Sequence, residues 1–162
     1  PRSVDEPLLL SNGIRLRGSI DLVEKRADGA IRATDYKTGK ARVSDGAIIG
    51  GGETLQPVLY ALALEKCFEG TPVDSGRLYY CTSNGEFRDV VIPLDDEARR
   101  AAADVAAAIG GAIEEGFLPA APQQRACEYC DYQPVCGPYE ELRVSKKKQD
   151  RLVTLTQLRK RV

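Results

Sequence analysis

Short apolar-rich runs separated by glycine-containing turns recur through the chain and predict β-strands paired in hairpins. Asn12-Gly13 and Asn84-Gly85 favour tight turns with positive φ, and Ala27-Asp28-Gly29 is a third turn signal. Arg77 to Cys81 and Arg88 to Ile92 also alternate apolar and polar side chains, as strands with one buried face do. The pattern predicts strands over residues 8–10, 14–17, 20–25, 31–37, 77–81 and 88–92.

Two longer segments have the composition and end signals of helices. The first runs from Leu55 to about Cys67, with Thr54 as its N-cap and Pro57 tolerated in its first turn. The second is rich in alanine and runs from Asp95 to about residue 115, with a weak point at Gly110-Gly111. The order of elements, βββ(β)αββα, predicts an α/β fold in which a curled mixed β-sheet is flanked by helices.

Composition places the chain among single globular domains. Its 162 residues are enough for a hydrophobic core, and 43% of them are hydrophobic and 29% charged, as in ordinary globular proteins. Every apolar run is short and interrupted by charge, so neither a membrane span nor a signal peptide is expected. The chain starts at Pro1 and contains no Met, which predicts a segment of a longer protein.

Charge is distributed unevenly along the chain. From Leu142 onward eight Lys and Arg residues face one acid, so this segment carries +7 while residues 1–141 carry −8. The net negative charge of residues 1–141 does not favour DNA binding. Any DNA binding must therefore come from a local groove, from the basic tail or from parts outside this chain. Lys146, Lys147 and Lys148 are candidates for contact with a DNA backbone. A solvated tail or linker is the alternative.

Two aspartates and a lysine form the candidate catalytic set. Asp35 and Lys37 are two positions apart on one predicted strand and share a face, while Asp21 lies on the preceding strand. If both acids bind one metal they must share a face, so we predict a three-residue turn over 27–29, or an equivalent bulge, which sets Asp21 opposite Asp35; a two-residue turn would put the acids on opposite faces. Two carboxylates bind Mg²⁺ or Mn²⁺ through oxygen, and a metal of this kind activates water against a phosphodiester. The set predicts metal-dependent nuclease chemistry, with the lysine stabilising charge on the phosphate.

Three motifs occur in order: Gly18-Ser19-Ile20-Asp21, Asp35-Tyr36-Lys37-Thr38-Gly39 and Gln56-Pro57-Val58-Leu59-Tyr60. This ordered set resembles the RecB-like branch of the PD-(D/E)XK nuclease superfamily, which includes AddB-type helicase–nucleases and the nucleases of CRISPR adaptation. The resemblance implies a restriction-endonuclease-like core. It also implies that Asp21, Asp35 and the backbone carbonyl of Tyr36 are metal ligands and that Lys37 orients the attacking water. Gln56 and Tyr60 would contact the DNA strand or brace the lysine.

Five cysteines are present, and Cys127, Cys130 and Cys136 lie close together. Clustered cysteines in a chain without secretory signals indicate metal or iron–sulfur ligands before disulfides. Their Cys-x₂-Cys-x₅-Cys spacing resembles the staple that holds a 4Fe–4S cluster in AddB and the CRISPR nucleases. A structural Zn²⁺ site is the chemical alternative. Cys67 and Cys81 are expected in the core.

The chain departs from that family in two respects. It has no cysteine ahead of Gly18 and no histidine anywhere, whereas the family supplies a fourth cluster ligand and a further metal ligand from upstream. We therefore expect that this segment alone has an incomplete ligand set, is inactive in isolation and holds an iron–sulfur cluster poorly.

These observations predict three parts: a PD-(D/E)XK core over 1–122, a cysteine segment over 123–137 and a basic tail over 138–162. The predicted function is a metal-dependent deoxyribonuclease of the exonuclease type that works beside a helicase in DNA repair or recombination, in the cytoplasm at the nucleoid. A non-catalytic DNA-binding or scaffolding module of the same fold and a stand-alone CRISPR-adaptation nuclease are the alternatives. The presence of Asp21, Asp35 and Lys37 together favours catalysis.

Overall fold

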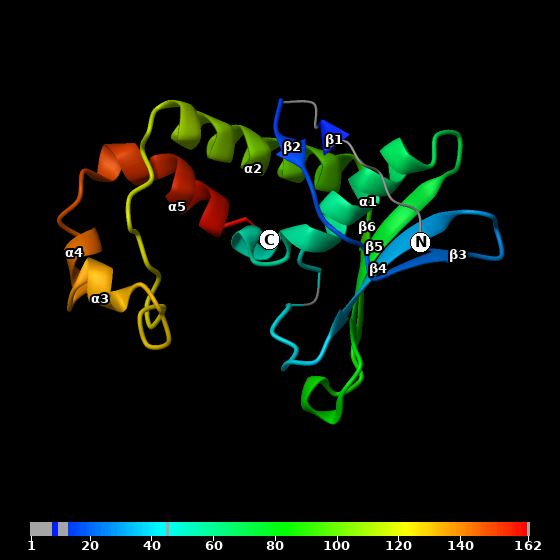
Figure 1. Cartoon of the computed structure of the whole chain (residues 1–162), viewed down its shortest axis with the longest axis horizontal. Helices are drawn as coiled ribbons and strands as arrows, with labels where there is room; N and C mark the ends of the chain where they lie inside the picture. The colour runs from blue at the N-terminus through cyan, green and yellow to red at the C-terminus, as the bar shows by residue number, and fades with distance from the viewer. Residues whose placement is uncertain (1–7, 10–12, 45, 162) are drawn as a thin grey trace.

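A mixed four-stranded sheet is the centre of the computed structural model, which describes residues 8–9, 13–44 and 46–161 (Figure 1). Its strands lie in the order β3-β4-β5-β6, and only the central pair, β4 and β5, is parallel. Parallel neighbours need a crossover connection, and helix α1 (Leu55–Cys67) supplies it. The predicted α/β class, a mixed sheet flanked by helices, is confirmed. The four strands are β3 (Leu22–Lys25), β4 (Ile31–Lys37), β5 (Val73–Tyr80) and β6 (Asp89–Pro93).

Strand β5 is longer than its local pattern predicted. It begins at Val73, four residues before Arg77, because pairing with β4 extends it over Asp74, Ser75 and Gly76. Asp and Gly are poor strand formers by themselves. Tertiary pairing therefore overrides local propensity here.

The first predicted hairpin forms a separate small sheet. Strands β1 (Leu8–Leu9) and β2 (Arg15–Leu16) pair antiparallel, while the predicted turn residues 11 and 12 lie outside the described residues. Ile14 approaches Gly110 of helix α2 (Asp96–Glu114), and Figure 1 shows the hairpin beside that helix. The small sheet therefore packs on a helix rather than extending the main sheet.

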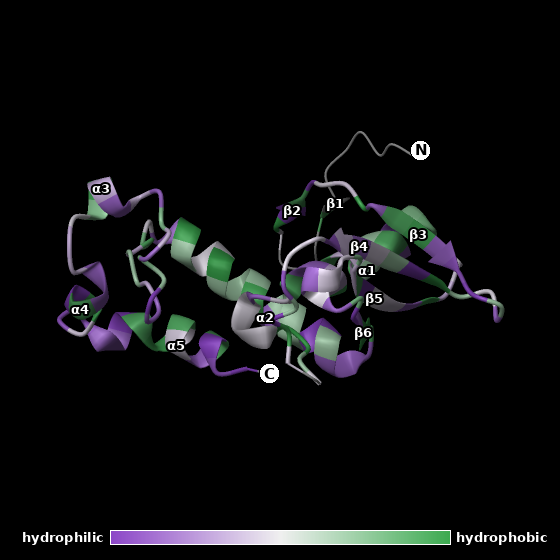
Figure 2. Ribbon diagram, turned by 90° about the horizontal axis from the view of Figure 1, so that it is seen from below, coloured by the Kyte–Doolittle hydropathy of each residue, from purple (hydrophilic) through white to green (hydrophobic). Residues whose placement is uncertain are grey.

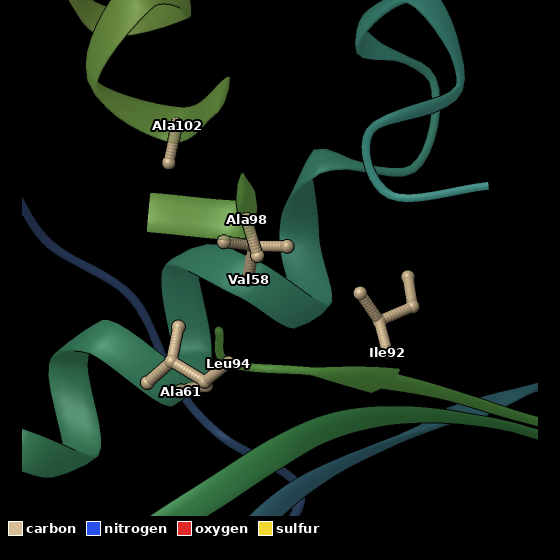
Figure 3. Packing of buried hydrophobic residues seen from close by; sticks show 6 residues of the cluster. All are labelled: Val58, Ala61, Ile92, Leu94, Ala98 and Ala102. Carbon is tan, nitrogen blue, oxygen red and sulfur yellow. The ribbon is translucent and has the colours of Figure 1, made fainter. Parts of the chain in front are cut away.

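The principal core lies where α1, β6 and α2 (Asp96–Glu114) meet (Figure 3). Three of its six residues are alanines, whose small side chains let the two helices approach closely. Burial of this apolar surface is the main favourable term in folding. The cluster consists of Val58, Ala61, Ile92, Leu94, Ala98 and Ala102.

Gly76 lets α1 lie directly on β5. A Cβ atom at this position would stand 2.1 Å from the carbonyl oxygen of Pro57, in the first turn of α1. Helix α1 has the predicted bounds, and Thr54 is at its N-cap position, but the Thr54 side chain makes no capping hydrogen bond. The packing of the first turn on the sheet, rather than a cap, fixes where this helix begins.

Helix α2 has a conventional N-terminus. The Asp95 side chain accepts a hydrogen bond of 2.9 Å from the Ala98 amide, which satisfies one of the free N–H groups of the first turn. Gly110 and Gly111 lie within the helix, so the predicted weak point does not interrupt it. Among the described residues, every helix is too short or too polar to span a bilayer.

The C-terminal region contains helices that the hydrophobic pattern did not predict. Figures 1 and 2 show α3 and α4 at the far end of the molecule from the sheet, while α5 returns toward it. Gly51, in the short helix η1 (Gly50–Gly52), donates a 2.8 Å hydrogen bond to the Arg161 carbonyl, and Leu158 packs against buried Ile49. The end of the basic segment is therefore folded onto the domain. Its elements are α3 (Gln133–Cys136), α4 (Glu140–Val144), η3 (Gln149–Leu152) and α5 (Val153–Arg159).

Candidate active site

The hairpin of β3 and β4 sets the two aspartates opposite each other. Its register pairs Leu22 with Thr34, and residues 27–29 form the turn, whose glycine has φ +90°. Continuing the register by one residue places Asp21 opposite Asp35. The predicted odd-numbered turn is confirmed.

Asp21 lies just before β3 and its carboxylate bonds to the neighbouring strand. Its Oδ2 accepts a hydrogen bond of 2.9 Å from the Tyr36 amide. In a continued antiparallel ladder the Tyr36 amide would donate to the Ile20 carbonyl. The Asp21 side chain accepts this hydrogen bond instead. Strand β3 therefore begins two residues later than predicted. The N–H and C=O groups of one strand residue point toward the same neighbouring strand. The Tyr36 carbonyl therefore points toward the side of β4 on which Asp21 lies.

Asp35 is buried, with 6% of its surface exposed. Its Oδ2 lies 2.5 Å from Lys37 Nζ, an ion pair without the alignment of a hydrogen bond, and within the described chain this oxygen accepts no hydrogen bond at all. A buried carboxylate oxygen without a donor is costly. Its free lone pairs suit a bound cation.

Lys37 connects the strand to helix α1. Its Nζ donates a 2.7 Å hydrogen bond to Gln56 Oε1, and Gln56 Nε2 donates a 2.8 Å bond to the Tyr60 hydroxyl. Gln56 and Tyr60 are one helical turn apart, as the sequence predicted. The structure therefore joins Asp35, Lys37, Gln56 and Tyr60 in one continuous polar chain.

The backbone that follows Lys37 is held by the connection between β5 and β6. The Lys37 carbonyl accepts a 3.0 Å hydrogen bond from the Cys81 amide, and the Thr82 hydroxyl donates a 3.0 Å bond to the Thr38 carbonyl. Gly85 allows this connection to lie close to the end of β5, because a Cβ atom at position 85 would stand 2.6 Å from the Cβ atom of Tyr80. Sequence reasoning missed these supports, since they join residues more than forty positions apart.

A pocket of about 280 Å³ adjoins Lys37. Three cationic side chains, Lys37, Lys40 and Arg42, line it together with the acid Glu53. Sequence reasoning did not single out Lys40, Arg42 or Glu53, because a short charged stretch is ordinary for a surface loop. The remaining lining residues are Gly39, Val43, Thr54, Gln56, Pro57, Leu78 and Tyr80.

The residues present fit a small oxygen-bound divalent metal. Across the described ranges no group of three or more Cys, Asp or Glu side chains is arranged to hold a metal ion. Mg²⁺ does not require one, because it keeps several waters and uses one or two carboxylates plus substrate phosphate. Asp21, Asp35 with its donor-free oxygen and the Tyr36 carbonyl are such a partial set.

Cys127, Cys130 and Cys136 are each half-buried, and the described structure does not bring their thiols into a group arranged for a metal ion. One acidic residue of α4 holds the backbone at Cys127. Glu141 accepts hydrogen bonds from the amides of Arg125 and Cys127, at 2.9 and 3.0 Å. Burial raises the pKa of the Cys127 thiol, and the charge of Glu141 and the neighbouring thiols raise it further. Metal ligation requires the thiolate, so binding would release protons. Cys67 and Cys81, expected in the core, are also only half-buried.

The lysines of the predicted DNA contact differ in their surroundings. Lys147 Nζ lies 2.6 Å from Glu140 Oε1 and also donates to the Ala120 carbonyl, so its charge is engaged within the fold. Lys146 and Lys148 are exposed. Together with the cysteine segment they belong to the region that Figures 1 and 2 place away from the sheet.

Comparison with known proteins agrees with this geometry. One relative is the CRISPR-associated exonuclease Cas4/endonuclease Cas1 fusion of Myxococcus xanthus (strain DK1622), 32% identical over 149 residues. The alignment covers 89% of this chain but 25% of the relative, so the chain spans about a quarter of that protein's length.

A sequence profile of the PD-(D/E)XK nuclease superfamily matches residues 2–137, which include the candidate catalytic residues and the clustered cysteines. The mixed sheet and its flanking helices agree with the restriction-endonuclease-like fold of that superfamily. The chain belongs to the PD-(D/E)XK nuclease superfamily.

Proposed function

We propose that this domain is a metal-dependent DNA nuclease whose catalytic residues are Asp21, Asp35 and Lys37. The observation that carries the proposal is the buried Asp35 oxygen, which has no hydrogen-bond donor and lies beside an ammonium group braced from α1. A Mg²⁺ or Mn²⁺ ion held by Asp21, Asp35 and the Tyr36 carbonyl would supply an activated water and neutralise phosphate charge.

The contacts of Lys37 within the domain position its ammonium group for the substrate. An ammonium group has three N–H donors. Gln56 Oε1 accepts one N–H at 2.7 Å, and Asp35 holds the ammonium by an ion pair of 2.5 Å without accepting a hydrogen bond, which leaves N–H donors for a phosphate oxygen or the attacking water. Tyr60 orients Gln56, so the helix holds the charge at one place before DNA arrives, which is the preorganisation that stabilises a transition state.

The test is single-turnover cleavage of labelled DNA by an excess of the full-length protein that contains this domain. We expect cleavage to require Mg²⁺ or Mn²⁺, to stop in EDTA and to be lost in Asp35→Ala and Lys37→Ala. Glu69→Ala and Lys66→Ala, which change exposed residues at the end of α1, are the matched controls and should retain wild-type rates. Wild-type cleavage by Asp35→Ala would move the active site elsewhere, and metal-dependent DNA binding without cleavage by the wild type would favour a scaffolding module.

The biological setting has two candidates. The AddB-type motifs support a role in repair beside a helicase. The similarity to the Cas4/Cas1 fusion supports CRISPR adaptation, in which a partner endonuclease domain takes the place of the helicase. Co-purification of the full-length protein from its own cells distinguishes them, since a helicase is expected in the first case and a Cas1-like protein or fused domain in the second.

We also propose that Cys127, Cys130 and Cys136 are ligands of an iron–sulfur cluster, with Zn²⁺ as the alternative. The half-buried thiols and the backbone anchoring by Glu141 support a structural metal site. The full-length protein purified without oxygen should be brown, with absorbance near about 400 nm from Cys-ligated iron. A colourless protein with stoichiometric zinc would decide for zinc.

A further inference from the structure

Two further cations, Lys40 and Arg42, line the pocket beside Lys37. Lys40 and Arg42 are both exposed, and neither makes a hydrogen bond or ion pair within the part of the chain that the structure describes. Other arginines near the sheet are paired: Arg32 contacts Glu24 at 2.9 Å, and Arg77 contacts the same carboxylate. The charges of Lys40 and Arg42 are therefore available to a ligand.

The loop exposes both side chains at the pocket. Exposure alternates from residue 40 to residue 44, so Lys40 and Arg42 are outward while Ala41 and Val43 are half-buried. The loop is anchored at its start by the Thr82–Thr38 hydrogen bond and at its end by Ile49, which is fully buried. The two cations therefore project from a supported segment next to the catalytic lysine.

The charge and size of the pocket indicate the ligand. Lys37, Lys40 and Arg42 outweigh the single acid Glu53, in a chain whose first 141 residues carry −8. At about 280 Å³ the pocket is near the lower end of the roughly 300–1,000 Å³ range of ligand sites. That size suits one phosphodiester unit of a single strand rather than a duplex. Arg binds phosphate through its planar fork and Lys as a point charge.

We propose that Lys40 and Arg42 bind backbone phosphate next to the scissile phosphate and so position the strand for Lys37. This inference rests on the proposed nuclease function. Because the contacts are to phosphate, they add affinity without sequence preference. Lys40 and Arg42 are positioning residues, and their loss should affect binding of the strand rather than the chemical step.

The test compares the double variant Lys40→Gln/Arg42→Gln with the control Lys66→Gln/Arg100→Gln, which removes two exposed cations outside the pocket. Binding of a fluorescein-labelled single-stranded oligonucleotide is followed by anisotropy in Ca²⁺ across a range of salt concentrations. We expect at least a tenfold weaker Kd and a salt slope smaller by about 1.4, from two lost single-strand phosphate contacts. In steady-state cleavage KM should rise tenfold with kcat within about twofold.

The outcomes separate this inference from the proposed function. If the wild type cleaves DNA but the double variant keeps the Kd, salt slope and KM of the control, the phosphate subsite is wrong and the nuclease stands. A loss of kcat at unchanged KM would also overturn it, because the residues would then act on chemistry. A full-length wild type that neither binds nor cleaves DNA refutes the proposed function itself, whereas its Asp35→Ala variant should bind DNA and not cleave it.

Discussion

Gly76→Ala tests whether the close packing of α1 on β5 positions the active site. Helix α1 carries Gln56, which holds Lys37, and its first turn rests on Gly76. The φ angle of Gly76 is not in the left-handed region, so alanine itself is tolerated by the backbone. The effect of the substitution therefore comes from one added methyl group against the helix.

The structure gives the size of that effect. The new Cβ would lie 2.1 Å from the Pro57 carbonyl oxygen and 2.4 Å from its carbon, both backbone atoms that no rotamer change can move. Ordinary contact begins near 3.4 Å, so the first turn must retreat by about 1.3 Å. Overpacking of this kind costs about 1–3 kcal/mol. A domain of this size loses about 2–4 °C of Tm per kcal/mol.

The same retreat acts on the active site. The Lys37–Gln56 hydrogen bond is 2.7 Å long, and a shift of about 1.3 Å takes it beyond hydrogen-bond range unless the side chains follow. We expect Gly76→Ala to lower Tm by roughly 2–12 °C and to reduce single-turnover cleavage at temperatures where the domain is still folded.

Gly111→Ala is the matched control. It adds the same methyl group to a glycine with nothing within 4 Å, inside α2, where alanine is favoured by up to about 1 kcal/mol. Thermal unfolding followed by circular dichroism and the cleavage assay are run on both variants. A Gly76→Ala protein as stable and as active as the wild type would refute the argument that direct backbone contact places α1.

Two further predictions concern single side chains. Gln56→Leu should lower kcat at least tenfold with little change in KM if Gln56 braces Lys37, whereas a rise in KM alone would mean that it contacts DNA instead. Glu65 and Arg99 link α1 to α2 through hydrogen bonds of 2.5 and 2.7 Å, which hold the pKa of Glu65 below its usual value of 4.5. A depressed pKa stabilises the fold above the unfolded-state value and loses that contribution as pH falls through the folded-state value. Urea unfolding should therefore show Glu65→Gln less stable than the wild type by up to about 1 kcal/mol at pH 7, and a gap that persists undiminished in strong acid would contradict this reasoning.

Local pattern determined much of this protein. The two-residue period of a strand put Asp35 and Lys37 on one face, and the three-residue turn over 27–29 set the register that brings Asp21 opposite Asp35. The bounds of α1 and the i, i+4 relation of Gln56 to Tyr60 also followed from residues close in sequence. These features depend on backbone geometry that a few neighbouring residues fix, and so the sequence was sufficient to predict them.

Tertiary structure decided the contacts between distant segments. Three such contacts join segments that no local sequence periodicity relates. They are the hydrogen bond from Lys37 to Gln56, the bond from Thr82 to Thr38 and the packing of the end of α5 on η1. The same is true of the pocket that collects Lys40 and Arg42 beside Lys37. Such contacts depend on how closely helices and sheet pack, which is the sum of many weak interactions across the core and is absent from any local stretch of sequence.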